Sequence, residues 1–150
     1  MKKQFALAVL AAAVATAYAG PFDAFKGKMK EGMYEYKMDM DMGQVPGMPP
    51  GMGKQSHTFQ HCVTKKDIEE GGFGKNQKQQ QEKCQIKNMD MKGNTATYTM
   101  ECTDPQMKAD NKITFTDNGF NMDMKMQMNQ RGQMMNMSQH MEGRYIGACK

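Results

Sequence analysis

Hydrophobic and polar residues alternate along much of the chain with the period of a β-strand. The clearest stretch begins at Tyr34, where apolar residues hold every second position and mostly charged residues stand between them. Successive side chains of a strand point to opposite faces of a sheet, so this stretch predicts a strand with one apolar and one charged face. Its apolar positions are Tyr34, Tyr36, Met38, Met40 and Met42.

The dipeptide Asn118-Gly119 predicts a tight hairpin in the last third of the chain. Asn-Gly is the strongest short signal for a two-residue turn between antiparallel strands. With these two residues in the turn, Phe115 lies opposite Met122 and Ile113 lies opposite Met124.

A second two-residue turn is predicted at Arg131-Gly132, which extends the hairpin into a three-stranded meander. A one-residue slip would scatter the apolar side chains over both faces, whereas this register keeps them on one. The register pairs Met128 with Met135, Met126 with Met137, and Met122 with Met141.

A third hairpin is expected around Lys92-Gly93-Asn94, between residues 85–91 and 95–101. It sets Ile86 opposite Met100 and Asn88 opposite Tyr98. The same register places Cys84 across from Cys102.

Three other segments read as connections or short helices. Residues 43–54, rich in Pro and Gly, cannot hold a ladder of hydrogen bonds and predict a loop. Thr64 and Asp67 stand at capping-box spacing and start a helix that Gly71-Gly72 ends. Phe22, Phe25 and Met29 share one helical face and predict a short N-terminal helix that covers the sheet.

These elements together predict an all-β fold. We expect about seven strands in an antiparallel up-and-down meander, curled into a barrel or half-barrel. The chain has 20 methionines, and beyond Leu10 it has no leucine. Methionine therefore supplies most of the interior, together with Tyr, Phe and Ile.

The N-terminus has the features of a cleaved secretory signal. Lys2-Lys3 precede an apolar run from Phe5 to Ala15, and Ala17-Tyr18-Ala19 provides small residues two apart. We expect a signal peptide at residues 1–19, a single disulfide-stabilised domain at residues 20–150, and a periplasmic location. No later stretch approaches the roughly 20 apolar residues of a membrane-spanning helix.

Charge argues against nucleic acid as a partner. Removing Lys2 and Lys3 from the 20 basic residues leaves 18 against 16 acidic ones, a balance of +2. So small an excess, without a basic run among aromatic residues, does not predict phosphate binding.

The four cysteines predict two disulfides, because the chain is expected in an oxidising compartment. Their spacing lacks the close pairs of a zinc site. Of the three connectivities, we prefer Cys62–Cys84 with Cys102–Cys149, since these links tie strand ends across the loop and to the C-terminus. Cys84–Cys102 remains open because the two residues face each other in the predicted hairpin.

The order of these signals resembles the secreted bacterial domain-of-unknown-function family 3617. The resemblance spans nearly all of the expected mature chain, although Tyr34 stands where members often have Trp. It implies a periplasmic location and a four-cysteine β fold, and it transfers no catalytic residue. The motifs are Gly32-Met33-Tyr34-Glu35, Pro-Gly-Met-Pro-Pro in the following loop, Gln60-His61-Cys62, Cys84, Gly93-Asn94-Thr95, Cys102 and Ile146-Gly147-Ala148-Cys149.

Repeated Met-x-Met motifs raise the question of a soft-metal site. Thioether sulfur suits Cu(I) or Ag(I), and sulfurs on one strand face can converge on such an ion. The simpler interpretation, which we prefer, is that flexible methionines fill an irregular core. The alternative site comprises Met38, Met40, Met42, Met48, Met52, Met122, Met124, Met126 and Met128.

No catalytic arrangement stands out. His57, His61 and His140 are expected on the surface, and no phosphate loop, dinucleotide fingerprint or Ser-His-Asp ordering has a supporting context. We therefore expect a non-catalytic binding or envelope-associated module without a cofactor. Its expected partner is a small apolar ligand or an envelope component, and the alternative function is periplasmic Cu(I) or Ag(I) binding.

Overall fold

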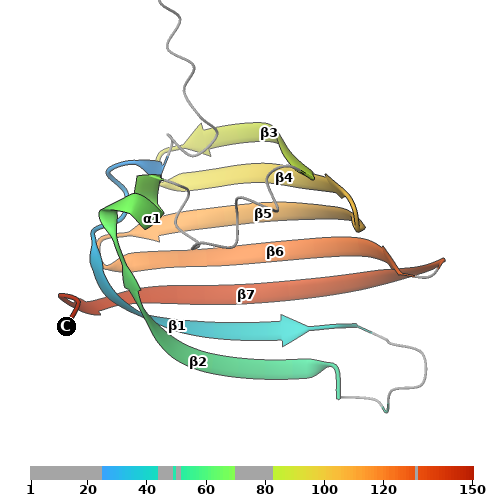
Figure 1. Cartoon of the computed structure of the whole chain (residues 1–150), viewed down its shortest axis with the longest axis horizontal. Coiled ribbons are helices and arrows are strands. Elements are labelled where there is room, and N and C mark those ends of the chain that lie inside the picture. Colours follow the sequence, from blue (N-terminus) through green and yellow to red (C-terminus); the bar gives the residue numbers. More distant parts are fainter. Residues whose placement is uncertain (1–24, 44–48, 50–51, 70–82, 131) are drawn as a thin grey trace, which may run out of the picture.

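Seven antiparallel strands form one open sheet (Figure 1). The structure is a computed structural model that describes residues 25–43, 49, 52–69, 83–130 and 132–150. The elements are β1 (Gly32–Asp41), β2 (Lys54–Val63), α1 (Lys65–Glu69), β3 (Cys84–Lys92), β4 (Thr95–Thr103), β5 (Gln106–Thr116), β6 (Gly119–Gln130) and β7 (Gln133–Gly147).

The strand order explains why the sheet stays open. Strands β3 to β7 form a meander, β1 pairs with β7, and β2 lies beyond β1, giving the order β2-β1-β7-β6-β5-β4-β3. β2 and β3 are the two edges and do not pair with each other. The predicted all-β antiparallel meander is thus confirmed, and its form is a half-barrel.

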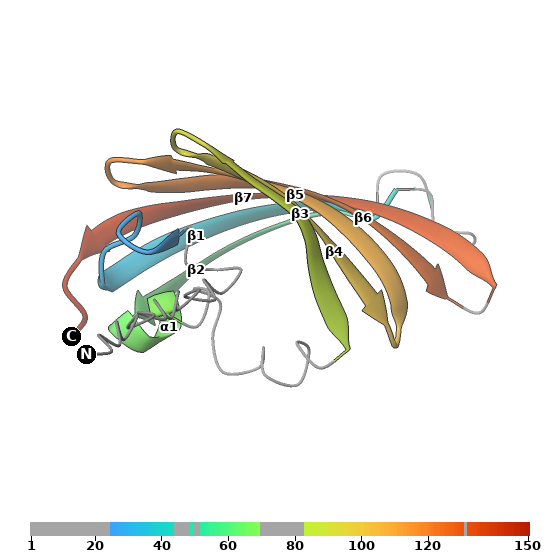
Figure 2. The same ribbon diagram turned by 90° about the horizontal axis from the view of Figure 1, so that it is seen from above.

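The sheet is bowed, and its concave side carries the hydrophobic core (Figure 2). We call this side the inner face and the opposite side the outer face. Phe25 covers one end of the inner face, with its ring 5.5 Å from that of Phe115 and 6.3 Å from that of Tyr98. Burial raises the pKa of Tyr36 and of Tyr98 to about 12. The buried cluster comprises Phe25, Tyr34, Tyr36, Val63, Ala96, Tyr98, Ile113, Phe115, Phe120, Met122 and Met141.

The β6–β7 register is the predicted one, whereas the β5–β6 register differs by two residues. Phe115 faces Phe120 and Ile113 faces Met122, so the turn residues are Asp117 and Asn118. A shift of two keeps every side chain on its face, which is why the core is unaffected. Gly119 lies in β6 instead of in the turn because β7 passes so close: a Cβ there would lie 1.9 Å from the carbonyl oxygen of Gly143.

A bulge in β3 changes the predicted third hairpin. Ile86 faces Met100 and Cys84 faces Cys102 as expected, but the register shifts between Lys87 and Asp90. The predicted pairing of Asn88 with Tyr98 is therefore wrong, and Asn88 adopts a positive φ of 53°. The extra residue turns Asp90 outward and lets Met89 and Met91 pack against the core.

The helix after β2 forms as predicted. The backbone amide of Thr64 donates to Asp67 Oδ2 at 2.9 Å, and the amide of Asp67 donates to Thr64 Oγ1 at 3.2 Å. These bonds make a capping box before α1. In the segment predicted as an N-terminal helix, residues 26–28 form a turn, and Phe22 lies outside the described residues.

No helix in the described part of the chain is long and apolar enough to cross a membrane. The predicted signal peptide lies outside the described residues.

The disulfides join Cys62 to Cys149 and Cys84 to Cys102. The preferred pairing of Cys62 with Cys84 and of Cys102 with Cys149 is therefore wrong. Met33 in β1 is paired with Cys62 on one side and with Gly147 on the other, so Cys149 follows within reach of Cys62. The two bonds have Cα–Cα distances of 5.5 Å and 3.9 Å respectively.

Removing the two disulfides separately should have unequal costs. Cys62–Cys149 closes a sequence separation of 87 residues and Cys84–Cys102 one of 18. The longer loop restricts the unfolded chain more, so replacing Cys62 and Cys149 by Ala should lower the free energy of unfolding by about 1.4 kcal/mol more than replacing Cys84 and Cys102. Urea unfolding of the two double variants measures the difference, and equal losses or the reverse order would contradict it.

Candidate functional site

Inner-face side chains form rows that run across the strands at the end of the sheet near Phe25. One row is aromatic: Phe59 stacks on Tyr36 with ring centroids 5.1 Å apart, and Phe120 lies on the far side of Gly143. Gly143 leaves room for the Phe120 ring, which a Cβ would approach to 2.4 Å. The next row, on β1, β7, β6, β5 and β4, consists of Met38, Met141, Met122, Ile113 and Ala96.

Methionines dominate the opposite end of the inner face. Met128 in β6 is paired with Met135 on one side and Met107 on the other, and Met126 is paired with Met137. These residues are half-buried, and among the described residues none of them packs against the buried cluster. We call the group the methionine patch, which comprises Met100, Met107, Met126, Met128, Met135 and Met137.

The methionines predicted as metal ligands do not form one site. Met122 belongs to the buried cluster, and Met38 and Met124 pack against it. The β1 methionines are separated from those of β6 by strand β7. Only Met126 and Met128 of the predicted set lie in the methionine patch.

Three predicted ligands follow β1 or lie in the loop after it. The amide of Met42 donates to the carbonyl oxygen of Gly53 at 2.9 Å, which holds the two ends of the loop together. Met52 is 63% exposed. Met48 lies outside the described residues.

The predicted set omitted the two immediate neighbours of Met128. The hairpin register at Arg131-Gly132 already pointed to Met135, since it paired that residue with Met128. Met107 was harder to predict, because its place in the row depends on how far β5 extends from Ile113 toward the N-terminal end of the strand.

The histidines lie on two different faces. His57 and His61 are exposed in β2 on the inner-face side, while His140 is on the outer face. His140 Nδ1 lies 2.7 Å from Asp123 Oδ1. Within the described ranges, no group of three or more His, Cys, Asp or Glu is placed to hold a metal ion.

The outer face carries charges that alternate in sign across neighbouring strands. Lys37 and Glu142 stand side by side on β1 and β7, and Asp123 and Lys112 stand side by side on β6 and β5. In another row, Arg144 Nη2 donates to Glu35 Oε1 at 2.7 Å. Such opposite neighbours favour the observed register, although each exposed pair contributes little by itself.

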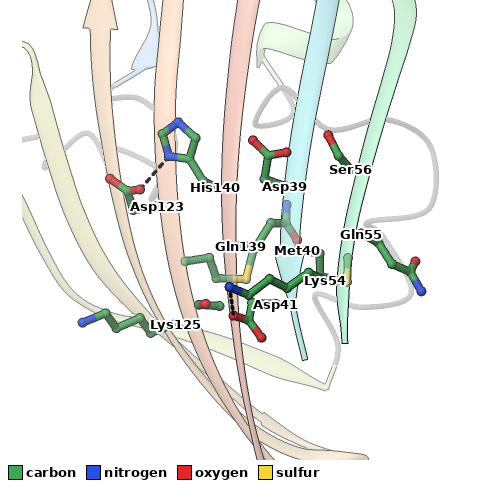
Figure 3. Close-up of a pocket in the computed structure, with 12 residues that line it drawn as sticks. Asp39, Met40, Asp41, Lys54, Gln55, Ser56, Asp123, Lys125, Gln139 and His140 are labelled. Carbon is green, nitrogen blue, oxygen red and sulfur yellow. Dashed lines mark hydrogen bonds and ion pairs between the residues drawn. The ribbon is translucent and has the colours of Figure 1, made fainter. Parts of the chain in front are cut away.

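An open groove of about 490 Å³ crosses the outer face over β2, β1, β7 and β6 (Figure 3). Each strand contributes three consecutive residues, of which the first and third point outward. Asp39 stands between His140 and Ser56, and within the described chain no serine hydroxyl is hydrogen-bonded to His140. The groove is therefore a solvated, charged surface in which His140 and Asp123 form only a pair.

Ion pairs lower the pKa of three exposed carboxyl groups. The hydrogen bond from Arg144 lowers the pKa of Glu35, and the hydrogen bond from Lys87 lowers that of Glu101. Lys83 acts likewise on the pKa of Asp104. All three groups stay ionised at neutral pH and link strands or strand ends on the outer surface.

Comparison with known proteins gives one match. The profile of a protein family described as "Protein of unknown function (DUF3617)" matches residues 29–149. No curated protein and no solved structure matches the chain.

Removing the arginine partner of Glu35 should raise the pKa of that carboxyl toward its ordinary value of 4.5. The folded-state pKa is depressed, so the pair's contribution to stability is present above the unfolded-state pKa and is lost as the pH falls through the folded-state value. Arg144→Gln should therefore reduce stability at neutral pH slightly and flatten the loss of stability in acid. Carboxyl NMR titration measures the shift, with Lys112→Gln as the control, and an unchanged Glu35 pKa in Arg144→Gln would contradict the assignment.

Proposed function

Because the chain belongs to the DUF3617 family of proteins of unknown function, we propose a function from its own structure: a non-catalytic module of the cell envelope that binds an apolar ligand on the methionine patch. The observation that carries the proposal is that these methionines share one face of the sheet and stay half-buried outside the buried cluster, beside the buried Ala109 and Cys102. The N-terminal secretory pattern supports export to the periplasm.

The chemistry of methionine suits this role. Its side chain is unbranched, flexible and polarizable, so a group of methionines can adapt to apolar ligands of different shape. Rows of neighbouring strands place such side chains about 4.5–5.5 Å apart, which gives a continuous apolar surface. The charged outer face offers no comparable surface.

The core at the other end of the inner face keeps the patch rigidly placed. Met126 and Met128 continue the same strand as the buried residues Phe120 and Met122. The strand backbone is therefore fixed by the core, while the side chains of the patch remain free to rearrange around a ligand.

Binding of N-phenyl-1-naphthylamine tests this proposal. Its fluorescence should rise on mixing with the protein and fall again when dodecanoic acid competes. Met126→Asp places a carboxylate in the patch and should raise the dissociation constant of the dye at least about tenfold. Met126 is half-buried and lies outside the buried cluster, so the Met126→Asp variant should still fold, with only a moderate fall in its melting temperature.

Gln127→Asp is the matched control, since Gln127 is the next residue and is exposed on the outer face. This variant should bind the dye like the parent. Absence of dye binding by the parent, or equal binding by the Met126→Asp variant, would contradict the proposal.

A second candidate function is binding of Cu(I) or Ag(I). One observation favours it: Met107, Met128 and Met135 lie side by side on three adjacent strands, and all three are half-buried. Thioethers are soft donors, and three neighbours on one face suffice to surround a soft monovalent ion. This row replaces the dispersed set expected from the sequence.

Anaerobic titration of Cu(I) against a competing chelator tests the second candidate. The parent should bind tighter than micromolar, and replacing Met107, Met128 and Met135 together by Leu should abolish binding. Leu retains apolarity and similar volume, so stability and dye binding should persist. Binding through sulfur should also survive at about pH 5, where histidine ligands are protonated.

Met38→Leu is the control for this experiment, because Met38 packs against the core in another row. Its Cu(I) affinity should equal that of the parent. Weak binding by the parent, or tight binding retained in the triple variant, would remove the metal candidate without affecting the apolar-ligand proposal.

A further inference from the structure

The two edges of the open sheet differ in how they are protected. An edge strand presents unpaired backbone amides and carbonyls, which invite pairing with another strand. β3 has two of the usual safeguards: a bulge at Asn88, and charged side chains at Lys87, Asp90 and Lys92. β2 has neither.

β2 is long, regular and almost uncharged. It spans Lys54–Val63, pairs with β1 in an uninterrupted register, and is exposed over most of its length. It contains no proline, and Lys54 at its first position is its only Lys, Arg, Asp or Glu. No other described strand lies beyond it (Figure 1).

An aromatic side chain marks the middle of this edge. Phe59 is 44% exposed and stacks nearly parallel on the buried Tyr36, with an interplanar angle of 9°. A large apolar ring on an exposed edge strand has the character of an interface anchor.

We propose that β2 pairs with β2 of a second copy of this chain, joining two half-barrels into one continuous antiparallel sheet. A two-fold axis at Phe59 sets this residue opposite Phe59 of the second copy, and the stacked Tyr36–Phe59 pair then continues across the axis. His57 lies opposite His61 of the second copy, and Gln55 lies opposite its Val63.

The charge pattern of the edge favours a second copy over other occupants. In this register Lys54 falls outside the ladder, opposite Thr64, so no charged side chain meets another. Pairing β2 with β3 of another copy would instead leave a free edge on each added molecule and give an open-ended polymer. The β3 bulge also opposes such pairing. An identical edge is neutral, equally long and self-complementary.

Sedimentation velocity of the disulfide-bonded protein tests this association. The protein should pass from monomer to dimer with rising concentration and form nothing larger. Phe59→Lys places two like charges on the axis and should raise the dimer dissociation constant at least about thirtyfold. Met134→Lys makes the same change at another exposed residue, which is 61% accessible on β7, and should leave the dimer intact.

A cross-linking pair fixes the register and remains informative if Phe59→Lys fails to fold. Phe59→Cys should form an intermolecular disulfide across the axis, whereas Lys87→Cys on the β3 edge should not. Two results of sedimentation would overturn the proposal: a parent that stays monomeric or forms polymers larger than a dimer, and a dimer unaffected by Phe59→Lys. Cross-linking through Lys87→Cys in preference to Phe59→Cys would overturn it as well.

Discussion

Cross-strand register is the constraint on which the rest of this structure depends. Alternation along each strand places apolar and charged residues on opposite sides, but only the correct alignment of seven strands collects them on the same two faces. The bulge at Asn88 has the same effect within a single strand, because the extra residue places Met89 and Met91 on the inner face. A slip of β6 by one residue would put Asp123 and Lys125 among the methionines of the inner face.

An open sheet covers only part of such a face, and the chain divides the inner face by side-chain type. Aromatic rings, Ile113 and Val63 fill the end near Phe25, where shapes interlock and burial is nearly complete. Methionine takes over where packing partners are fewer. This residue tolerates a loosely packed environment because its three rotatable bonds let it adjust to whatever lies beside it. The division separates the buried cluster, which stabilises the fold, from the half-buried methionine patch, on which we place the proposed ligand.

Local patterns in the sequence predicted the strands, the capped helix and the antiparallel meander, because each depends on neighbouring residues, but they left open whether the sheet closes. The Arg131-Gly132 turn fixed its register correctly, and with it the pairing of Met128 with Met135. The Asn118-Gly119 turn misled by two residues, since Gly119 is needed for the close approach of Gly143, a contact between segments distant in sequence. Disulfide pairing failed for a similar reason: the proximity of Cys149 to Cys62 follows from β1 lying between β2 and β7. The sequence predicted the type of site, a methionine-rich inner face. It could not predict which methionines form the site, because that depends on which of them are buried in the core.

The positions of the two disulfides limit how copies of this chain can associate. Each bond holds one edge strand: Cys62–Cys149 fastens β2 to the segment after β7, and Cys84–Cys102 fastens β3 to β4. Exchange of an edge strand between molecules, the usual route to domain swapping, would require that strand to leave its own sheet. With both disulfides formed, neither edge strand can be exchanged between molecules on its own. Assembly through a single edge strand must therefore proceed by addition of complete folded units, and its reversal leaves each unit intact.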